Sequence, residues 1–220
     1  MLSLGEQAYE RIRRMIVRLD LAPGAVIAED DLQTRLGIGR TPIREALQRL
    51  AREQFVTVVP RRGAFVTGID VDELALLYET RAVLEPYAAR LAASRGTEAA
   101  HWAPMVAALD RAGRPDVRAD ELIDIDQRCH ELIWAAAGNR FLTDTLDTLY
   151  AQSDRVWHMY LAEVADMADA VTEHIAILAA LRSGDADGAA ALAEQHVRAF
   201  DAQIRAAVTT RVNASPLAAS

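Results

Sequence analysis

Two periodicities of apolar residues divide the chain. In the first part, apolar side chains recur every three to four positions, which predicts helices over about 4–19, 29–36 and 40–54. Two β-rich runs follow at 55–59 and 64–67, and they predict a hairpin. From about residue 70 onward the period is helical again. We therefore expect two domains, 1–68 and 69–209, followed by a disordered tail at 210–220.

The turns of the first part predict a winged helix-turn-helix. Gly37 and Gly39 flank the link between the second and third helices, where a tight corner needs the backbone freedom of glycine. Pro42 fits only the first turn of the third helix, because proline breaks a helix interior. The hairpin that follows has Arg61 and Arg62 at its tip and forms the wing.

The second part predicts a bundle of helices and nothing else. Breaks rich in glycine or proline separate six stretches with a helical period. These stretches cover about 72–94, 97–111, 117–137, 139–162, 166–182 and 185–208. Apolar stripes along them indicate that they pack against one another.

Composition and charge narrow the class of protein. Of 220 residues, 51% are hydrophobic and 25% charged, which is typical of a folded protein. Residues 1–68 carry 11 arginines against 8 acidic residues, a net charge of +3, whereas residues 69–220 carry 13 against 24, a net charge of −11. A basic N-terminal domain and an acidic C-terminal domain indicate that the two domains have different partners.

Several classes are excluded or disfavoured by what the sequence lacks. Its single cysteine, Cys129, excludes an intramolecular disulfide and a zinc site with several cysteines. There is no uncharged apolar run long enough to span a membrane, and charges interrupt the N-terminus where a signal peptide needs apolar residues. We expect a cytoplasmic protein without a membrane partner.

The third helix and the wing carry the candidate DNA contacts. A helix fits the major groove and its N-terminal residues meet the base edges first, which places Arg40, Thr41 and Arg44 there. Arg61 and Arg62 on the wing would add phosphate or minor-groove contacts. A solvated arginine face is the alternative for any one of these residues, but the whole arrangement favours double-stranded DNA.

Four residues of the bundle have the types and spacing of a metal site. Asp126 and His130 are four positions apart on one helix and share a face. His174 and His196 lie on two helices joined by a short link, so antiparallel packing brings them level. Three imidazoles and one carboxylate suit Zn, Ni, Mn or Fe. Ordinary buried histidines are the alternative, and the spacing alone leaves both possibilities open.

The N-terminal motifs are specific enough to indicate a family. They are Pro23-Gly24, Gly39-Arg40-Thr41-Pro42-Ile43-Arg44-Glu45-Ala46-Leu47-Gln48-Arg49-Leu50 and Arg62-Gly63-Ala64-Phe65-Val66. With them, residues 5–67 resemble the GntR family of bacterial transcription regulators. The resemblance implies that Arg40, Thr41, Arg44 and Gly63 lie at the DNA, and we add Arg49 from the same helix. Gln54 stands where the family often has glycine.

The bundle resembles the effector-binding (FCD-type) domain of the FadR branch of that family. The matching motifs are Arg81-Ala82-Val83-Leu84-Glu85, Asp126-Gln127-Arg128-Cys129-His130, Glu173-His174-Ile175, Gly184-Asp185 and His196. The resemblance implies a divalent cation on Asp126, His130, His174 and His196, and six helices indicate the shorter, VanR-like subgroup. The expected fold is mainly α, with an N-terminal winged helix-turn-helix domain followed by an all-α six-helix effector-binding bundle.

These features together predict a regulator, not an enzyme. We expect a homodimer that binds a palindromic operator, acts as a repressor, and responds to a small carboxylate bound at the metal. Arg81, Arg128 and Arg155 are the candidate partners of a second acidic group on that effector. For Arg81, an ion pair with Glu85 four positions further along the helix is the alternative.

Three alternatives remain open. In the first, the cation itself is the signal, and in the second the bundle is a metal-free dimerisation body. The third, a metal-dependent hydrolase, is weaker because Trp134 stands where the metalloprotease pattern beginning at His130 needs a second histidine.

Overall fold

The computed structural model describes residues 2–96, 98–160 and 167–214. Contacts between residues divide the chain into two compact units. The N-terminal unit comprises Met1–Val71 together with Asp154–Met159, and the C-terminal unit comprises Asp72–Ser153 and Tyr160–Ser220. The two units are described separately.

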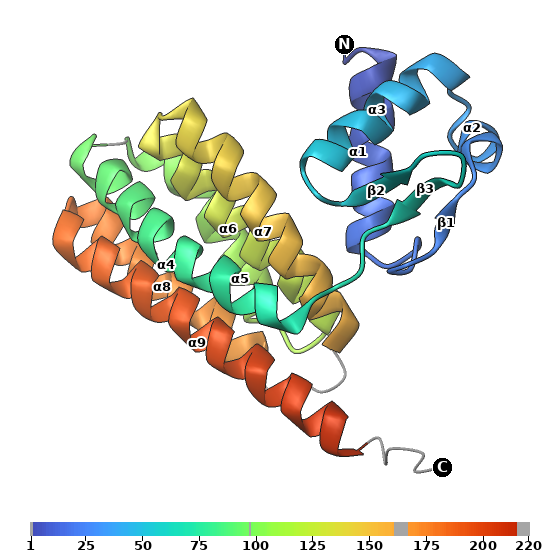
Figure 1. Cartoon of the computed structure of the whole chain (residues 1–220). Helices are drawn as coiled ribbons and strands as arrows, with labels where there is room; N and C mark the ends of the chain where they lie inside the picture. Colours follow the sequence, from blue (N-terminus) through green and yellow to red (C-terminus); the bar gives the residue numbers. More distant parts are fainter. Residues whose placement is uncertain (1, 97, 161–166, 215–220) are drawn as a thin grey trace. The chain divides into compact units, whose positions relative to one another are not determined.

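The N-terminal unit contains three helices and a small sheet (Figure 1). Its elements are α1 (Leu4–Val17), β1 (Val26–Ile27), α2 (Glu29–Leu36), α3 (Arg40–Arg52), β2 (Val56–Val59) and β3 (Gly63–Val66). Helix α3 packs on α1 and α2, with its buried face formed by Ile43, Ala46, Leu47 and Leu50. The three-stranded antiparallel sheet has the order β1-β3-β2, which confirms the predicted winged helix-turn-helix.

Local sequence explains where these elements begin and end. Ser3 caps α1, because its Oγ accepts a hydrogen bond from the backbone N–H of Glu6 and its own backbone N–H donates to the Glu6 carboxylate. Gly37 ends α2 with a φ of 66°, the left-handed conformation that glycine adopts at little cost. Pro42 lies in the first turn of α3, as expected.

The C-terminal unit is built from helices alone within the described residues. They are α4 (Val71–Ser94), η1 (Ala99–Trp102), α5 (Ala103–Ala112), α6 (Ala119–Ala137), α7 (Arg140–Tyr160), α8 (Met167–Ser183) and α9 (Ala186–Ala214). Residues Asp154–Met159, near the end of α7, belong to the N-terminal unit. The six α-helices match the six predicted stretches, and the stretch expected at 97–111 consists of the short 3-10 helix η1 followed by α5. Helix α9 continues to Ala214, into the region expected as tail, and residues 215–220 lie outside the described part.

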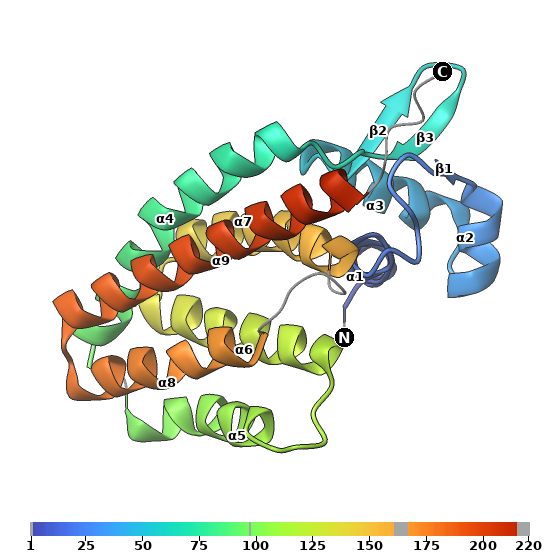
Figure 2. The same cartoon turned by 90° about the horizontal axis from the view of Figure 1, so that it is seen from below.

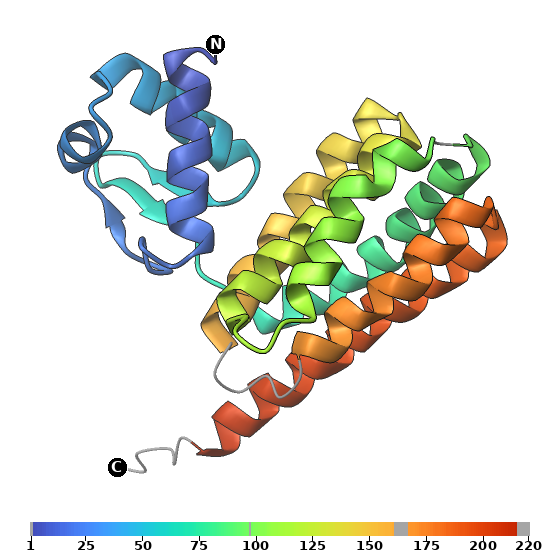
Figure 3. The same cartoon turned by 180° about the vertical axis from the view of Figure 1, so that it is seen from behind.

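Packing in this unit brings α6, α8 and α9 together. Helices α8 and α9 form an antiparallel hairpin across Gly184, and α6 packs on α8 (Figure 2). Seen from behind, α6 and α7 run side by side (Figure 3). A buried cluster that includes Ala88, Trp134 and Leu146 fills the space between α4, α6 and α7. Within the described residues, the structure contains no helix that is both long and apolar enough to cross a membrane.

Candidate metal centre and candidate DNA interface

Four side chains from three helices converge in the interior of the C-terminal unit. Asp126 and His130 come from α6, His174 from α8 and His196 from α9. All four are buried, and one nitrogen or oxygen of each lies within 4.8 Å of the others. The structure therefore brings the four predicted residues together, and they are called the histidine cluster below.

Most distances within the histidine cluster are longer than ordinary hydrogen bonds. Asp126 Oδ1 lies 3.5 Å from His174 Nδ1 and 3.5 Å from His196 Nε2, and Asp126 Oδ2 lies 3.6 Å from His130 Nε2. Among the described residues, the buried Oδ1 atom accepts no hydrogen bond. A buried acceptor in that state costs roughly 1–3 kcal/mol. A cation among these atoms would remove that cost.

Two glutamates outside the histidine cluster fix the tautomers of two of its histidines. His130 Nδ1 lies 3.0 Å from Glu85 Oε2, and His196 Nδ1 lies 2.7 Å from Glu173 Oε2. Because a carboxylate only accepts, each Nδ1 carries the hydrogen, and in a neutral imidazole Nε2 then holds the lone pair. The two Nε2 atoms face each other at 3.2 Å. Such an arrangement is stable only with positive charge between them, from a metal ion or a proton.

The electrostatics of the histidine cluster favour positive charge there. Burial alone would lower the pKa of His196, but the carboxylates of Asp126 and Glu173 outweigh it and raise that pKa to about 9. Burial alone would raise the pKa of the Asp126 carboxyl, but the neighbouring imidazoles, His130 foremost, hold it well below its usual range. The Asp126 carboxylate is therefore ionised near neutral pH, which is the form that binds a cation.

The residue types of the histidine cluster fit a divalent transition metal. Three imidazole nitrogens and one carboxylate oxygen form a mixed donor set that suits Zn, Ni, Mn or Fe. Glu85 and Glu173 supply the outer hydrogen bonds that metal-bound histidines usually make. The site thus has four donors, and two of its three histidines have a carboxylate support.

The first of these supports, Glu85 on α4, belongs to a buried network. Its Oε2 accepts hydrogen bonds from His130 and from Trp134 Nε1, and its Oε1 accepts from Nε and Nη2 of Arg81. Burial alone would raise the pKa of Glu85, but the charges of His130 and Arg81 and these hydrogen bonds lower it to about 2. The ion pair between Arg81 and Glu85, which their spacing on the helix predicts, is therefore present at 2.9 Å, whereas the contact of Glu85 with His130 was not predicted.

The network continues from Arg81 to the other side of the histidine cluster. Arg81 Nη1 donates to Ser153 Oγ at 2.7 Å, and Ser153 Oγ donates to the backbone oxygen of Tyr150. The Tyr150 hydroxyl donates to Asp126 Oδ2 at 2.7 Å. Two members of the histidine cluster are therefore linked through α4, α6 and α7.

The other two candidate effector residues lie outside this network. Arg128 is exposed and pairs with Glu131 on its own helix at 3.1 Å. Arg155 is buried in the N-terminal unit, where its Nη2 donates to the backbone oxygen of Thr67. Burial lowers the pKa of Arg155 to about 10. The structure brings neither residue to the histidine cluster.

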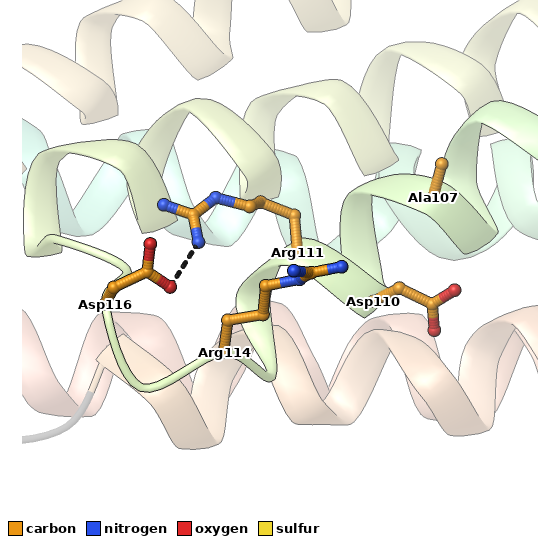
Figure 4. Close-up of a pocket in the computed structure, with 5 residues that line it drawn as sticks. All are labelled: Ala107, Asp110, Arg111, Arg114 and Asp116. Carbon is orange, nitrogen blue, oxygen red and sulfur yellow. Dashed lines mark hydrogen bonds and ion pairs between the residues drawn. The ribbon is translucent and has the colours of Figure 1, made fainter.

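A hollow of about 510 Å³ lies at the surface of the C-terminal unit, between α5 and the start of α6 (Figure 4). Arg111 points into it and pairs with Asp116 at 2.8 Å. Glu121 binds the same guanidinium at 2.6 Å. Two carboxylates therefore hold Arg111, and Arg114 is a second arginine in the lining of this hollow.

In the N-terminal unit, the start of α3 presents the predicted reading residues to solvent. Arg40, Thr41 and Arg44 are exposed, and α3 begins at Arg40 with Gly39 as its N-cap. Within the unit, the Nε atoms of Arg40 and Arg44 both face Glu29 of α2. Glu29 was not among the predicted site residues.

The wing and the far end of α3 carry the remaining candidates. Arg61 and Arg62 are exposed in the turn between β2 and β3, and Gly63 has a φ of 100° that favours glycine. Arg49 is held differently, because its guanidinium lies 3.6 Å from the ring centre of Tyr9 and pairs with Glu53. Arg49 therefore also joins α3 to α1.

Comparison with known proteins agrees with this architecture. Residues 4–66 match the family model described as bacterial regulatory proteins, gntR family, and residues 76–199 match the FCD domain. The HTH-type transcriptional repressor RspR of Escherichia coli is 28% identical over 203 residues, covering 92% of this chain and 89% of RspR.

Two solved structures share the fold. E. coli McbR/YncC superposes with a TM-score of 0.83 at 22% identity, over 93% of this chain and 98% of that one. A structure described as the metal-free FCD domain of TM0439 covers 65% of this chain and 99% of its own, with a TM-score of 0.56 at 19% identity. The FCD match spans more than half of the chain and includes the whole histidine cluster. This chain belongs to the GntR family of bacterial regulatory proteins and is a DNA-binding transcriptional regulator with an FCD domain.

Proposed function

We propose that the chain is a transcriptional repressor whose affinity for its operator is controlled by a small organic acid bound at a divalent metal. The metal ligands are Asp126, His130, His174 and His196. One observation carries this proposal: three imidazole nitrogens and one carboxylate oxygen, all buried, lie within 4.8 Å of one another, and among the described residues Asp126 Oδ1 accepts no hydrogen bond. The similarity to RspR supports a repressor, and the FCD structure described as metal-free supports a domain that takes a metal.

The bound cation would supply a positive centre for a carboxylate of the effector. Arg81 is the residue in the same network that suits a second acidic group, because Glu85 and Ser153 use three of its N–H donors and a guanidinium has five. Arg128 and Arg155 lie elsewhere and are not part of this proposal. A regulator needs no catalytic group, and we propose no enzymatic activity.

At the DNA, Arg40, Thr41 and Arg44 enter the major groove and read base edges. An arginine that donates two hydrogen bonds to guanine contributes roughly 1–3 kcal/mol of discrimination. Arg61 and Arg62 contact phosphates or the minor groove beside the wing. The positive φ of Gly63 shapes the turn that carries Arg61 and Arg62. Arg49, further along α3, contributes another contact to the DNA.

The assembly we propose is a homodimer on a palindromic operator. Members of this family commonly dimerise, and a two-fold dimer presents two copies of α3 to two half-sites. The six α-helices of the C-terminal unit in the described residues support our assignment of the chain to the VanR-like subgroup. Effector binding changes the packing of helices next to the histidine cluster and thereby the spacing of the two DNA-binding units.

Elemental analysis tests the metal. Protein purified without chelator should carry about one divalent ion per chain, and a double variant, His174→Ala with His196→Ala, should carry none. His101→Ala is the matched control, because His101 lies on η1 outside the histidine cluster. Equal metal content in the double variant and the control would refute the site.

Operator binding tests what the metal does. The operator is first selected by the wild-type protein from a random duplex library, and its affinity is then measured while a divalent metal and a panel of mono-, di- and tricarboxylates are titrated separately. A response to an acid that requires the metal supports the proposal. A response to the metal alone identifies a metal sensor instead, and the absence of any response indicates a bundle that only dimerises.

A further inference from the structure

One carboxylate on α2 faces both arginines that we assign to base reading. Glu29 Oε2 accepts a hydrogen bond from Arg44 Nε at 2.8 Å and lies 3.4 Å from Arg40 Nε. Glu29 is the first residue of α2, and its side chain is 28% exposed, against 60% for Arg40 and 55% for Arg44. Glu29 is therefore the least exposed of these three side chains.

The choice of nitrogen matters for DNA recognition. Both contacts use Nε, so within the described residues Glu29 takes neither of the two terminal amino groups of Arg40 or Arg44. An arginine reads guanine by donating two hydrogen bonds to N7 and O6. A guanidinium held at Nε keeps such donors free and loses less side-chain freedom when it binds DNA.

The charge of Glu29 also matters. Non-specific binding depends on the attraction between basic residues and phosphates, and the N-terminal part of the chain (residues 1–68) carries a net charge of only +3. A carboxylate beside two reading arginines weakens their attraction for any phosphate. The same carboxylate weakens the two hydrogen bonds from an arginine to guanine less, because those bonds depend mainly on where the two donors are placed.

From these contacts we propose that Glu29 determines specificity as a positioning residue: it holds Arg40 and Arg44 for base reading and lowers affinity for unrelated DNA. The inference rests on the proposed assignment of Arg40 and Arg44 as base-reading residues. The inference explains why an acidic residue, Glu29, lies beside Arg40 and Arg44, on a surface where attraction to DNA alone would favour basic residues.

The next two acidic residues of α2 provide a matched control. Asp31 pairs with Arg35 at 3.7 Å and Asp30 accepts a hydrogen bond from Gln33, so each is held within its own helix. Removing Asp31 changes the net charge by the same amount as removing Glu29, in the same turn of the helix. Asp31→Ala therefore reproduces the charge change without releasing Arg40 and Arg44.

The experiment compares the wild type with Glu29→Ala, Glu29→Gln, Asp31→Ala and Arg44→Ala. Fluorescence anisotropy gives the affinity for the selected operator, for duplexes with single base changes and for an unrelated duplex, between about 50 and 200 mM salt. Circular dichroism and melting curves establish that each variant is folded. The quantity compared is the ratio of operator affinity to affinity for the unrelated duplex.

We expect this ratio to fall about tenfold in Glu29→Ala, because the arginines lose their support and binding to the unrelated duplex tightens. Asp31→Ala should tighten binding to both duplexes and change the ratio by less than about twofold. In Glu29→Gln the amide oxygen still accepts from Nε, so the ratio should lie between these two values.

Two results would overturn the inference, and they differ. Equal ratios in Glu29→Ala and Asp31→Ala would show that Glu29 acts only through net charge. If Arg44→Ala kept full discrimination between the operator and its base-changed versions, the assignment of Arg44 as a base-reading residue would fail, and the inference with it.

Discussion

The hydrogen bond between Glu173 and His196 gives the sharpest test of the metal centre. Glu173 lies outside the histidine cluster, and its side chain is 34% exposed, so Glu173→Ala leaves no buried charge unpaired. The change removes the acceptor that holds the hydrogen on His196 Nδ1. Nε2 then loses its fixed lone pair, and we expect metal affinity to fall by about 10- to 100-fold.

The expected stability change follows from that affinity. A metal held at a concentration about 100 times the wild-type Kd stabilises the folded protein by about 2.7 kcal/mol. If the Kd rises tenfold, the same concentration gives about 1.4 kcal/mol, and if it rises 100-fold, about 0.4 kcal/mol. The metal-dependent part of the free energy of unfolding should therefore fall to about half or less.

Competition with a chromophoric chelator measures the Kd for Zn²⁺ and Ni²⁺, and urea denaturation with and without metal measures the stability. Glu194→Ala is the control, because Glu194 lies on α9 close to His196 in sequence but is paired with Arg198 at 2.7 Å. The reasoning is refuted if Glu173→Ala and Glu194→Ala bind metal equally well, since the carboxylate would then not support His196.

Other predictions concern stability. Glu85→Gln should lower the free energy of unfolding by about 3–5 kcal/mol, because it leaves the buried Arg81 without its ion pair. Replacing both Arg81 and Glu85 by methionine should lower it less, because no buried charge is then left unpaired. Urea denaturation of both variants measures these changes, and equal losses of stability would contradict the explanation. Gln54→Gly should stabilise the protein by about 1 kcal/mol, because Gln54 has a φ of 65°. Gln48→Gly, inside α3, should destabilise it by about 1 kcal/mol, and thermal melts that shift in the same direction for both would refute this explanation.

Local patterns were sufficient to predict most of the fold. Apolar periodicity gave the helices, and glycine or proline marked their ends, as at Gly37, Gly138 and Gly184, which all have positive φ. The histidine cluster was also predictable, since Asp126 and His130 share a helix face and a short link aligns His174 with His196. These relations depend on spacing within one helix or one hairpin.

Contacts between distant elements were not predictable. Glu85 reaches His130 across 45 positions of sequence, and Glu29 reaches Arg44 across 15. No local periodicity distinguishes these glutamates from solvated acids, because their roles come from the packing of α4 on α6 and of α2 on α3. For the same reason, the sequence did not show that Arg128 points to solvent and that Arg155 is bound to Thr67.

The buried charges of the C-terminal unit indicate which effectors to test first. Asp126 and Glu85 are buried and negative, and Arg81 is buried and positive, so these three groups sum to −1. A divalent cation among the histidines brings the sum to +1, and burying an uncompensated charge is costly. Glu173 compensates it only in part, because its side chain is partly exposed to solvent. A carboxylate ligand brings the buried sum to zero, whereas an amine would raise it to +2 and a neutral sugar would leave it unchanged. Electrostatics therefore favours organic acids over amines and sugars as ligands of this site.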